Sequence, residues 1–127
     1  MADPQERAPT YDGRRFRSVS NEAAGTPGDV GAETVFEYHQ DGPAVWAVYR
    51  GGTVVRGTLV ATADAAGVLD MRYAHVAADG ALRTGLCRST PETLPDGRLR
   101  LHEAWRWTGG AEGAGTSIVE EVVDPAP

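Results

Sequence analysis

The sequence predicts an all-β protein, a single antiparallel meander of about eight strands closed into a small up-and-down β-barrel. Three observations carry this prediction. Short segments that alternate apolar and polar residues recur about every 10 to 14 residues, a spacing typical of all-β proteins. Asp-Gly and Gly-Gly breaks separate the segments, and they supply the positive φ that tight hairpins need. No segment keeps the 3.6-residue period of an amphipathic helix.

The first half of the chain contains four of these segments. They are RFRSVSN (15–21), ETVFEYHQ (33–40), AVWAVYR (44–50) and TVVRGTLVATA (53–63). Residues 22–32, EAAGTPGDVGA, combine small side chains with glycine and proline, so they predict a flexible loop after the first strand. The two later breaks are shorter and predict hairpins: DGP at 41–43 and GG at 51–52.

The second half repeats the pattern. Its segments are VLDMRYAHVA (68–77), ALRTGLCRS (81–89), RLRLHEAWRWT (98–108) and GTSIVEEVV (115–123). The breaks before or between them are DAAG (64–67), ADG (78–80), PDG (95–97) and GG (109–110). The one helical signal is STPET at 89–93, where Pro91 follows two capping residues and predicts a single turn at most.

An open meander of eight strands would leave two unpaired edges, and closure into a barrel removes them. A two-sheet β-sandwich is the alternative. The predicted shape resembles avidin-like and lipocalin-like barrels, whose interior is filled by side chains or holds one small ligand. We expect one barrel domain over residues 11–123, between disordered ends at 1–10 and 124–127.

Composition narrows the functional classes. A net charge of −6 over 127 residues argues against nucleic acid or an anionic membrane as the main partner. The polar N-terminus does not resemble a signal peptide, and the single cysteine, Cys87, fits a reducing compartment, so we expect a cytoplasmic protein. All twelve basic residues are arginines, which excludes a lysine Schiff base.

One strand places an acid among aromatic residues. In RLRLHEAWRWT, alternation puts Glu103 on the same face as Trp105 and Trp107. Combining this face with one face of each neighbouring segment gives a candidate interior that suits a partly apolar ligand anchored at a polar point. The predicted ligand-binding residues are Phe36, Tyr38, Trp46, Met71, Tyr73, Leu86, Trp105 and Trp107. The alternative is that these residues simply pack as a core.

Glu103 and Arg88 are the candidate catalytic pair. A carboxyl group in an apolar pocket has a raised pKa, which makes it a usable acid or base near neutral pH. A nearby Arg88 would hold it ionised, and the pair could anchor a polar ligand or stabilise an enolate. The alternative is a structural ion pair. The three histidines lie on different segments without ligand spacing, so we expect no metal site, and no motif indicates a cofactor.

These residues favour a small-molecule-binding barrel. The first alternative is a cofactor-independent isomerase or cyclase that acts on a small metabolite, with Glu103 as its acid or base. The second is an interaction module in which a sheet face forms a homodimer.

Several strings resemble a family of short, single-domain bacterial proteins whose members often carry the label N-acetylglutamate synthase. The strings are FRSVSN, ETVFEY, LDMRY, TGLCRSTPE, RLHEAWRWT and GTSIVEE, between Tyr11 and Glu121. The resemblance implies a cytoplasmic bacterial domain and adds an acetyltransferase to the alternatives. An acetyltransferase of the usual kind needs a glycine-containing pyrophosphate turn that opens a helix, and the residues indicate neither.

Overall fold

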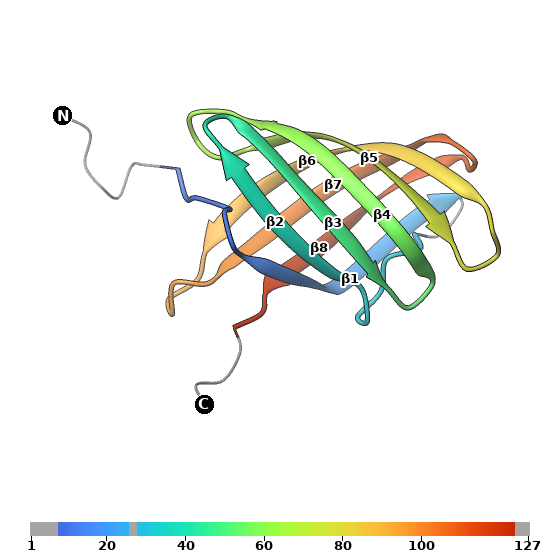
Figure 1. Ribbon diagram of the computed structural model, residues 1–127, viewed down its shortest axis with the longest axis horizontal. Helices are drawn as coiled ribbons and strands as arrows, with labels where there is room; N and C mark the ends of the chain where they lie inside the picture. Colours follow the sequence, from blue (N-terminus) through green and yellow to red (C-terminus); the bar gives the residue numbers. More distant parts are fainter. Residues whose placement is uncertain (1–7, 26–27, 124–127) are drawn as a thin grey trace.

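A computed structural model describes residues 8–25 and 28–123 and confirms the closed barrel. The strands are β1 (Arg15–Gly25), β2 (Val35–Asp41), β3 (Ala44–Gly51), β4 (Val54–Ala63), β5 (Leu69–Ala77), β6 (Leu82–Thr93), β7 (Leu99–Gly109) and β8 (Gly113–Glu121). Each strand pairs antiparallel with the next, and β8 returns to pair with β1 (Figure 1). The described residues contain no helix.

β1 is longer than the sequence indicated. Residues 22–25, expected to begin a flexible loop, continue the strand and pair with β8, from Glu22 opposite Thr116 to Gly25 opposite Gly113. The loop prediction was wrong there because the first residues of β8 supply backbone partners that no local pattern reveals. Within the described residues, the loop proper covers 28–34.

The helical signal at 89–93 was also wrong, because these residues belong to β6. Pro91 can lie in a strand here because the last β5 partner of β6 is opposite Ser89, two residues earlier. Beyond that point β6 pairs only with β7, where Pro91 faces Leu101, so its missing N–H removes no bond from the β5 side.

The predicted disordered ends lie mostly outside the described residues, which exclude 1–7 and 124–127. Of the described residues before β1, Pro9 lies against Gly67, and the carbonyl of Thr10 accepts a bond from Arg14 Nε at 2.6 Å.

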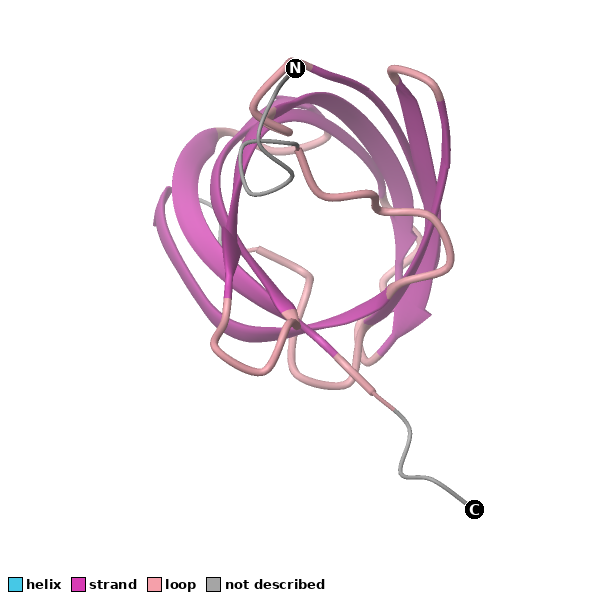
Figure 2. Cartoon of the chain, turned by 90° about the vertical axis from the view of Figure 1, so that its left-hand side faces the viewer, coloured by secondary structure: helices cyan, strands magenta, loops and turns pink. Residues whose placement is uncertain are grey.

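The two ends of the barrel differ. At one end, called the terminal end here, β1 begins and β8 ends (Figure 1). Tyr11 is fully buried there and donates its hydroxyl to the carbonyl of Gly67, in the hairpin between β4 and β5. Because β1 and β5 are opposite in the ring of strands, this residue crosses the terminal end, which Figure 2 views along the barrel. Fully or almost fully buried side chains fill the space behind it: Phe16, Tyr38, Val45, Leu69, Leu99, Leu101 and Val119.

Candidate binding cavity

The opposite end, called the cavity end here, is walled by aromatic rings that lie over glycines. Three rings face a glycine on the next strand: Tyr49 faces Gly57, Tyr73 faces Gly85 and Trp105 faces Gly115. A Cβ atom on these glycines would lie 2.3, 2.2 and 2.5 Å, respectively, from the facing side chain. Each ring therefore occupies the space that a side chain on the neighbouring strand would take, and it lies along the wall.

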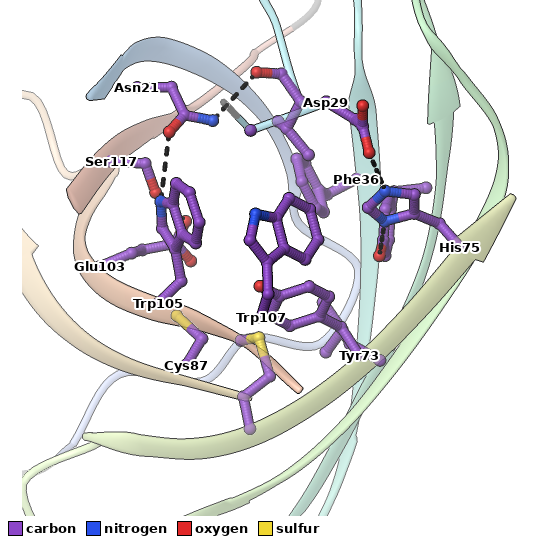
Figure 3. Close-up of a pocket in the computed structure, with 15 residues that line it drawn as sticks. Asn21, Asp29, Phe36, Tyr73, His75, Cys87, Glu103, Trp105, Trp107 and Ser117 are labelled. Atoms are coloured by element: carbon purple, nitrogen blue, oxygen red, sulfur yellow. Dashed lines mark hydrogen bonds and ion pairs between the residues drawn. The ribbon is translucent and has the colours of Figure 1, made fainter. Parts of the chain in front are cut away.

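A cavity remains among these rings, with about 50 Å³ open to the centres of water molecules. Trp107 lies in the middle of the group, with Glu103 and Ser117 on one side and Asp29 and His75 on the other (Figure 3). The residues that line the cavity are Asn21, Gly28, Asp29, Val30, Phe36, Tyr49, Leu59, Met71, Tyr73, His75, Cys87, Glu103, Trp105, Trp107 and Ser117. This lining is mostly apolar and carries a few polar groups, the composition expected of a small-molecule site.

Glu103 is one of two acids in the cavity wall, the other being Asp29. It lies in β7 opposite Ser117 of β8, whose hydroxyl donates to Glu103 Oε1 at 3.0 Å. Desolvation by the surrounding protein raises the pKa of Glu103 to about 7, although the bond from Ser117 favours the ionised form and acts in the opposite direction. The carboxyl group can therefore either donate or accept a proton near neutral pH.

A chain of polar contacts forms the other wall. Tyr49 Oη lies 2.9 Å from His75 Nδ1, and His75 Nε2 lies 2.7 Å from Asp29 Oδ2. Because an ionised carboxylate only accepts, Nε2 donates to Asp29, and in the neutral imidazole Nδ1 accepts from Tyr49. Arg83 completes the chain at 3.1 Å from Asp29 Oδ2.

This chain also fastens the loop that follows β1. Asp29 comes from residues 28–34, and its carbonyl accepts a bond from Thr53 Oγ1 in the β3–β4 hairpin. Asn21 holds the same loop from inside the barrel: its Nδ2 donates to the carbonyl of Val30 at 3.1 Å, and its Oδ1 accepts from Trp105 Nε1 at 3.2 Å (Figure 3). The loop and the tryptophan therefore share one hydrogen-bonded link.

The structure brings together most of the residues that the sequence placed inside. Phe36, Met71, Tyr73, Trp105, Trp107 and Glu103 line the cavity. Tyr38 is also interior, but it is buried against Phe16 and Tyr11 towards the terminal end and does not reach the cavity.

Three predicted residues lie on the outer face, so their placement in the interior was wrong. Trp46 is 40% exposed and stacks on His39 outside the barrel. Leu86 is partly exposed on the outer face of β6, and Arg88 is exposed. Arg88 lies opposite Asp70 and Ala104, whereas Glu103 points inward. The expected Arg88–Glu103 pair is therefore absent from the described residues.

Charge would have identified the correct face of β3 but not that of β6. Trp46 shares its face of β3 with Arg50, whereas the opposite face carries Val45, Ala47 and Tyr49. In β6, Leu86 shares its face with Arg88, against Gly85, Cys87 and Ser89. In β3 the interior is the face without a charge, since burial of an unpaired arginine is costly. In β6 the inner face also carries an arginine, Arg83, which lies opposite the buried His75 and pairs with Asp29 at 3.1 Å, so charge alone does not mark the inner face. Choosing the larger side chains selected the wrong face.

Sequence reasoning missed several polar residues of the cavity. His75 shares a face with Met71 and Tyr73, and this alternation was the signal that could have found it. No local pattern marks Asn21 or Asp29, because their positions depend on how the loop after β1 returns to the barrel. Within the described residues, no group of His, Cys, Asp and Glu side chains is placed to hold a metal ion.

Comparisons with known proteins agree with this geometry. A family model described as Avidin-like protein matches residues 9–122, nearly all of the chain. Neither a search of curated proteins nor a search of solved structures finds a match. The described residues include no helix long and apolar enough to cross a membrane.

Proposed function

Because the chain belongs to the avidin-like protein family, we propose that it is a small-molecule-binding protein that takes its ligand into the cavity end of the barrel. One observation carries the proposal. Aromatic rings and two acids, Asp29 and Glu103, surround an unfilled space at this end, whereas the terminal end of the same barrel is packed with apolar side chains. A cavity with an apolar wall and a few convergent polar groups is the usual form of a ligand site.

The size of the cavity limits the ligand. A water molecule needs roughly 10–15 Å³ of space for its centre, so about 50 Å³ corresponds to a few non-hydrogen atoms. Biotin, a bicyclic urea with a long carboxylic tail, is a ligand of avidin-like proteins. Its entry would require Trp107 to move, since this ring occupies the middle of the group (Figure 3).

The test is a titration of intrinsic tryptophan fluorescence and melting temperature against small metabolites, with biotin, acetyl-CoA and glutamate included. We expect a saturable change for at least one compact ligand. Trp105→Phe should weaken its binding, whereas Trp46→Phe, on the outer face, should leave it unchanged. Equal loss of affinity in both variants would contradict binding in the cavity. A response to acetyl-CoA alone would favour the acetyltransferase alternative.

A second function, a cofactor-independent isomerase or cyclase, is favoured by a specific arrangement. Glu103, with a pKa of about 7, lies across Trp107 from the Tyr49–His75–Asp29 chain, so a bound metabolite would have an acid–base group on each side. Glu103→Gln should then abolish turnover and leave binding intact. Turnover that survives this change would exclude Glu103 as the acid–base group.

The expected homodimer and the cytoplasmic location stay predictions. Light scattering over a range of protein concentrations would test the first, and a chain that stays monomeric at high concentration would contradict it.

A further inference from the structure

Glu103 differs from the other partly buried carboxylates of the barrel. Three of these have an arginine partner: Asp29 with Arg83 at 3.1 Å, Glu120 with Arg100 at 2.9 Å and Glu121 with Arg14 at 2.6 Å. Glu103 forms no ion pair with any described residue. The group that donates a hydrogen bond to it from Ser117 is a neutral hydroxyl. The carboxyl group is therefore desolvated without the positive charge that would compensate for it.

One arginine, Arg83, lies at the cavity end, but it pairs with Asp29 on the wall opposite Glu103. No arginine is among the described residues that line the cavity itself, and the chain contains no lysine. The walls instead present aromatic rings, with the centroids of Trp105 and Trp107 5.3 Å apart and those of Tyr73 and Trp107 6.0 Å apart. Aromatic faces attract cations through their quadrupole, most strongly in tryptophan.

We propose that the ligand of this cavity is a compact organic cation, an ammonium or amidinium group with few further atoms, which pairs with the Glu103 carboxylate against the tryptophan rings. This inference rests on the proposed function and names the chemical class of its ligand. A neutral ligand would leave the acid uncompensated, and an anion would meet a carboxylate and the electron-rich faces of the rings. A cation provides the missing charge in a space of the right size.

The proposal implies that affinity depends on pH. A cation binds the ionised form of Glu103, whose pKa of about 7 makes this form a minority below pH 7. Affinity should rise up to tenfold per pH unit as pH increases towards 7, and it should level off above 7. A neutral ligand that accepts a hydrogen bond from protonated Glu103 would show the opposite trend.

The effect of Glu103 on the pH dependence of binding must be distinguished from the effects of other titratable groups. Those that interact with it electrostatically have a pKa raised by burial and stay neutral between pH 5.5 and 8.5: Tyr11, Tyr38, Tyr49, Tyr73 and Cys87. His75 lies on the other wall, where it contacts Asp29, and Arg83 pairs with the same carboxylate. A Glu103 variant distinguishes the two sources.

The experiment uses three ions or molecules of the same shape: acetamidinium, acetamide and acetate. Each is added to the ¹⁵N-labelled protein up to millimolar concentrations, and the indole N–H signals are followed by NMR. Acetamidinium should shift the signals of Trp105 and Trp107 with a saturable curve, more tightly at pH 8 than at pH 6. The signal of Trp46, on the outer face, should not move and serves as an internal reference.

Glu103→Gln should weaken acetamidinium binding about tenfold or more at pH 8 and remove its pH dependence, because a charge-assisted hydrogen bond is lost. Glu37→Gln makes the same change on the exposed outer face of β2 and should leave binding unchanged. If the pH dependence persists in the Glu103 variant, it comes from another group, and the inference is overturned.

Two further outcomes separate this inference from the proposed function. If acetamide or acetate binds as tightly as acetamidinium, the cation class is wrong and the cavity is still a small-molecule site. If none of the three probes shifts Trp105 or Trp107, the cation class is overturned, and the metabolite titration decides the proposed function by itself.

Discussion

The two ends of this barrel are built from the same eight strands but have opposite interiors. At the terminal end, Leu69, Leu99 and Leu101 are fully buried beneath Tyr11. At the cavity end, rings lie along the wall over glycines, and acids and amides reach the interior. The terminal end therefore provides most of the close packing. At the cavity end the interior is less filled, and polar side chains surround the unfilled space. The comparison indicates that close packing and the polar cavity are divided along the barrel axis.

The largest expected effect comes from a leucine at each end. Leu101→Ala, at a fully buried site, should lower the free energy of unfolding by roughly 4 kcal/mol, because little surrounding structure can fill the space. Leu59 is also buried, at 2% exposure, but it borders the cavity and has fewer contacts to lose, so Leu59→Ala should cost roughly 2 kcal/mol. Urea unfolding measures both variants. Equal losses would show that the two ends are packed alike.

The next effect is a gain in stability at the cavity end. A rise of the Glu103 pKa from 4.5 to about 7 means that the folded state binds a proton more tightly than the unfolded state, so stability falls as pH rises between these values. The full cost above pH 7 is roughly 3 kcal/mol. Glu103→Gln should therefore stabilise the protein by up to about this amount at pH 8, and by less than about 1 kcal/mol at pH 5.

Unfolding curves for this variant, the wild type and Glu37→Gln at both pH values test the prediction. The Glu37 variant should change little at either pH because its side chain is exposed. A benefit of equal size at pH 5 and pH 8 would mean that Glu103 carries no ionisation cost, and the two ends would then differ in packing alone.

Much of this division follows from sequence, but not all of it. The strand alternation and the glycine-containing turns sufficed for the closed meander, because both are local signals. The inward position of Glu103 followed from its place between Leu101 and Trp105. The inner face of β3 was assigned wrongly because side-chain size was weighed above charge, which placed Trp46 inside. The inner face of β6 was also assigned wrongly, with Arg88 inside, and charge does not separate its two faces because Arg83 lies on the inner one. The role of Asp29 depends on a loop that returns across the barrel mouth, which no short window of sequence encodes.

A smaller effect tests the rings that lie over glycines. Replacing glycine with alanine within a strand ordinarily stabilises a protein by about 0.5–1 kcal/mol. Gly115→Ala should instead destabilise by about 2 kcal/mol, because the new Cβ would lie 2.2 Å from the carbonyl oxygen of Glu22 and 2.5 Å from the Trp105 ring, so that both the β1 backbone and the ring must shift. Thermal unfolding and tryptophan fluorescence report both effects. Gly31→Ala, with no atom within 4 Å of the added Cβ, is the control and should be neutral or slightly stabilising.

The smallest expected effect concerns the loop at the mouth. Asp29→Asn keeps an oxygen for His75 Nε2 but removes the charge that pairs with Arg83, so we expect a loss of about 1 kcal/mol. Hydrogen exchange at residues 28–34 should become faster, while exchange at the terminal end stays the same. Faster exchange at both ends would show that the loop contributes to global stability and that the ends are not independent.

The pairing of rings with glycines also bears on how members of this family could diverge. A change from a glycine codon to an alanine codon needs one nucleotide substitution. At Gly57, where the three nearest atoms all belong to the Tyr49 ring, that substitution adds a single methyl group behind the ring and pushes the ring inward, so it remodels the cavity without altering any side chain that lines it. Natural selection can therefore change the shape of the cavity through a residue behind its wall. The polar side chains of the cavity and the packed terminal end are then inherited unchanged.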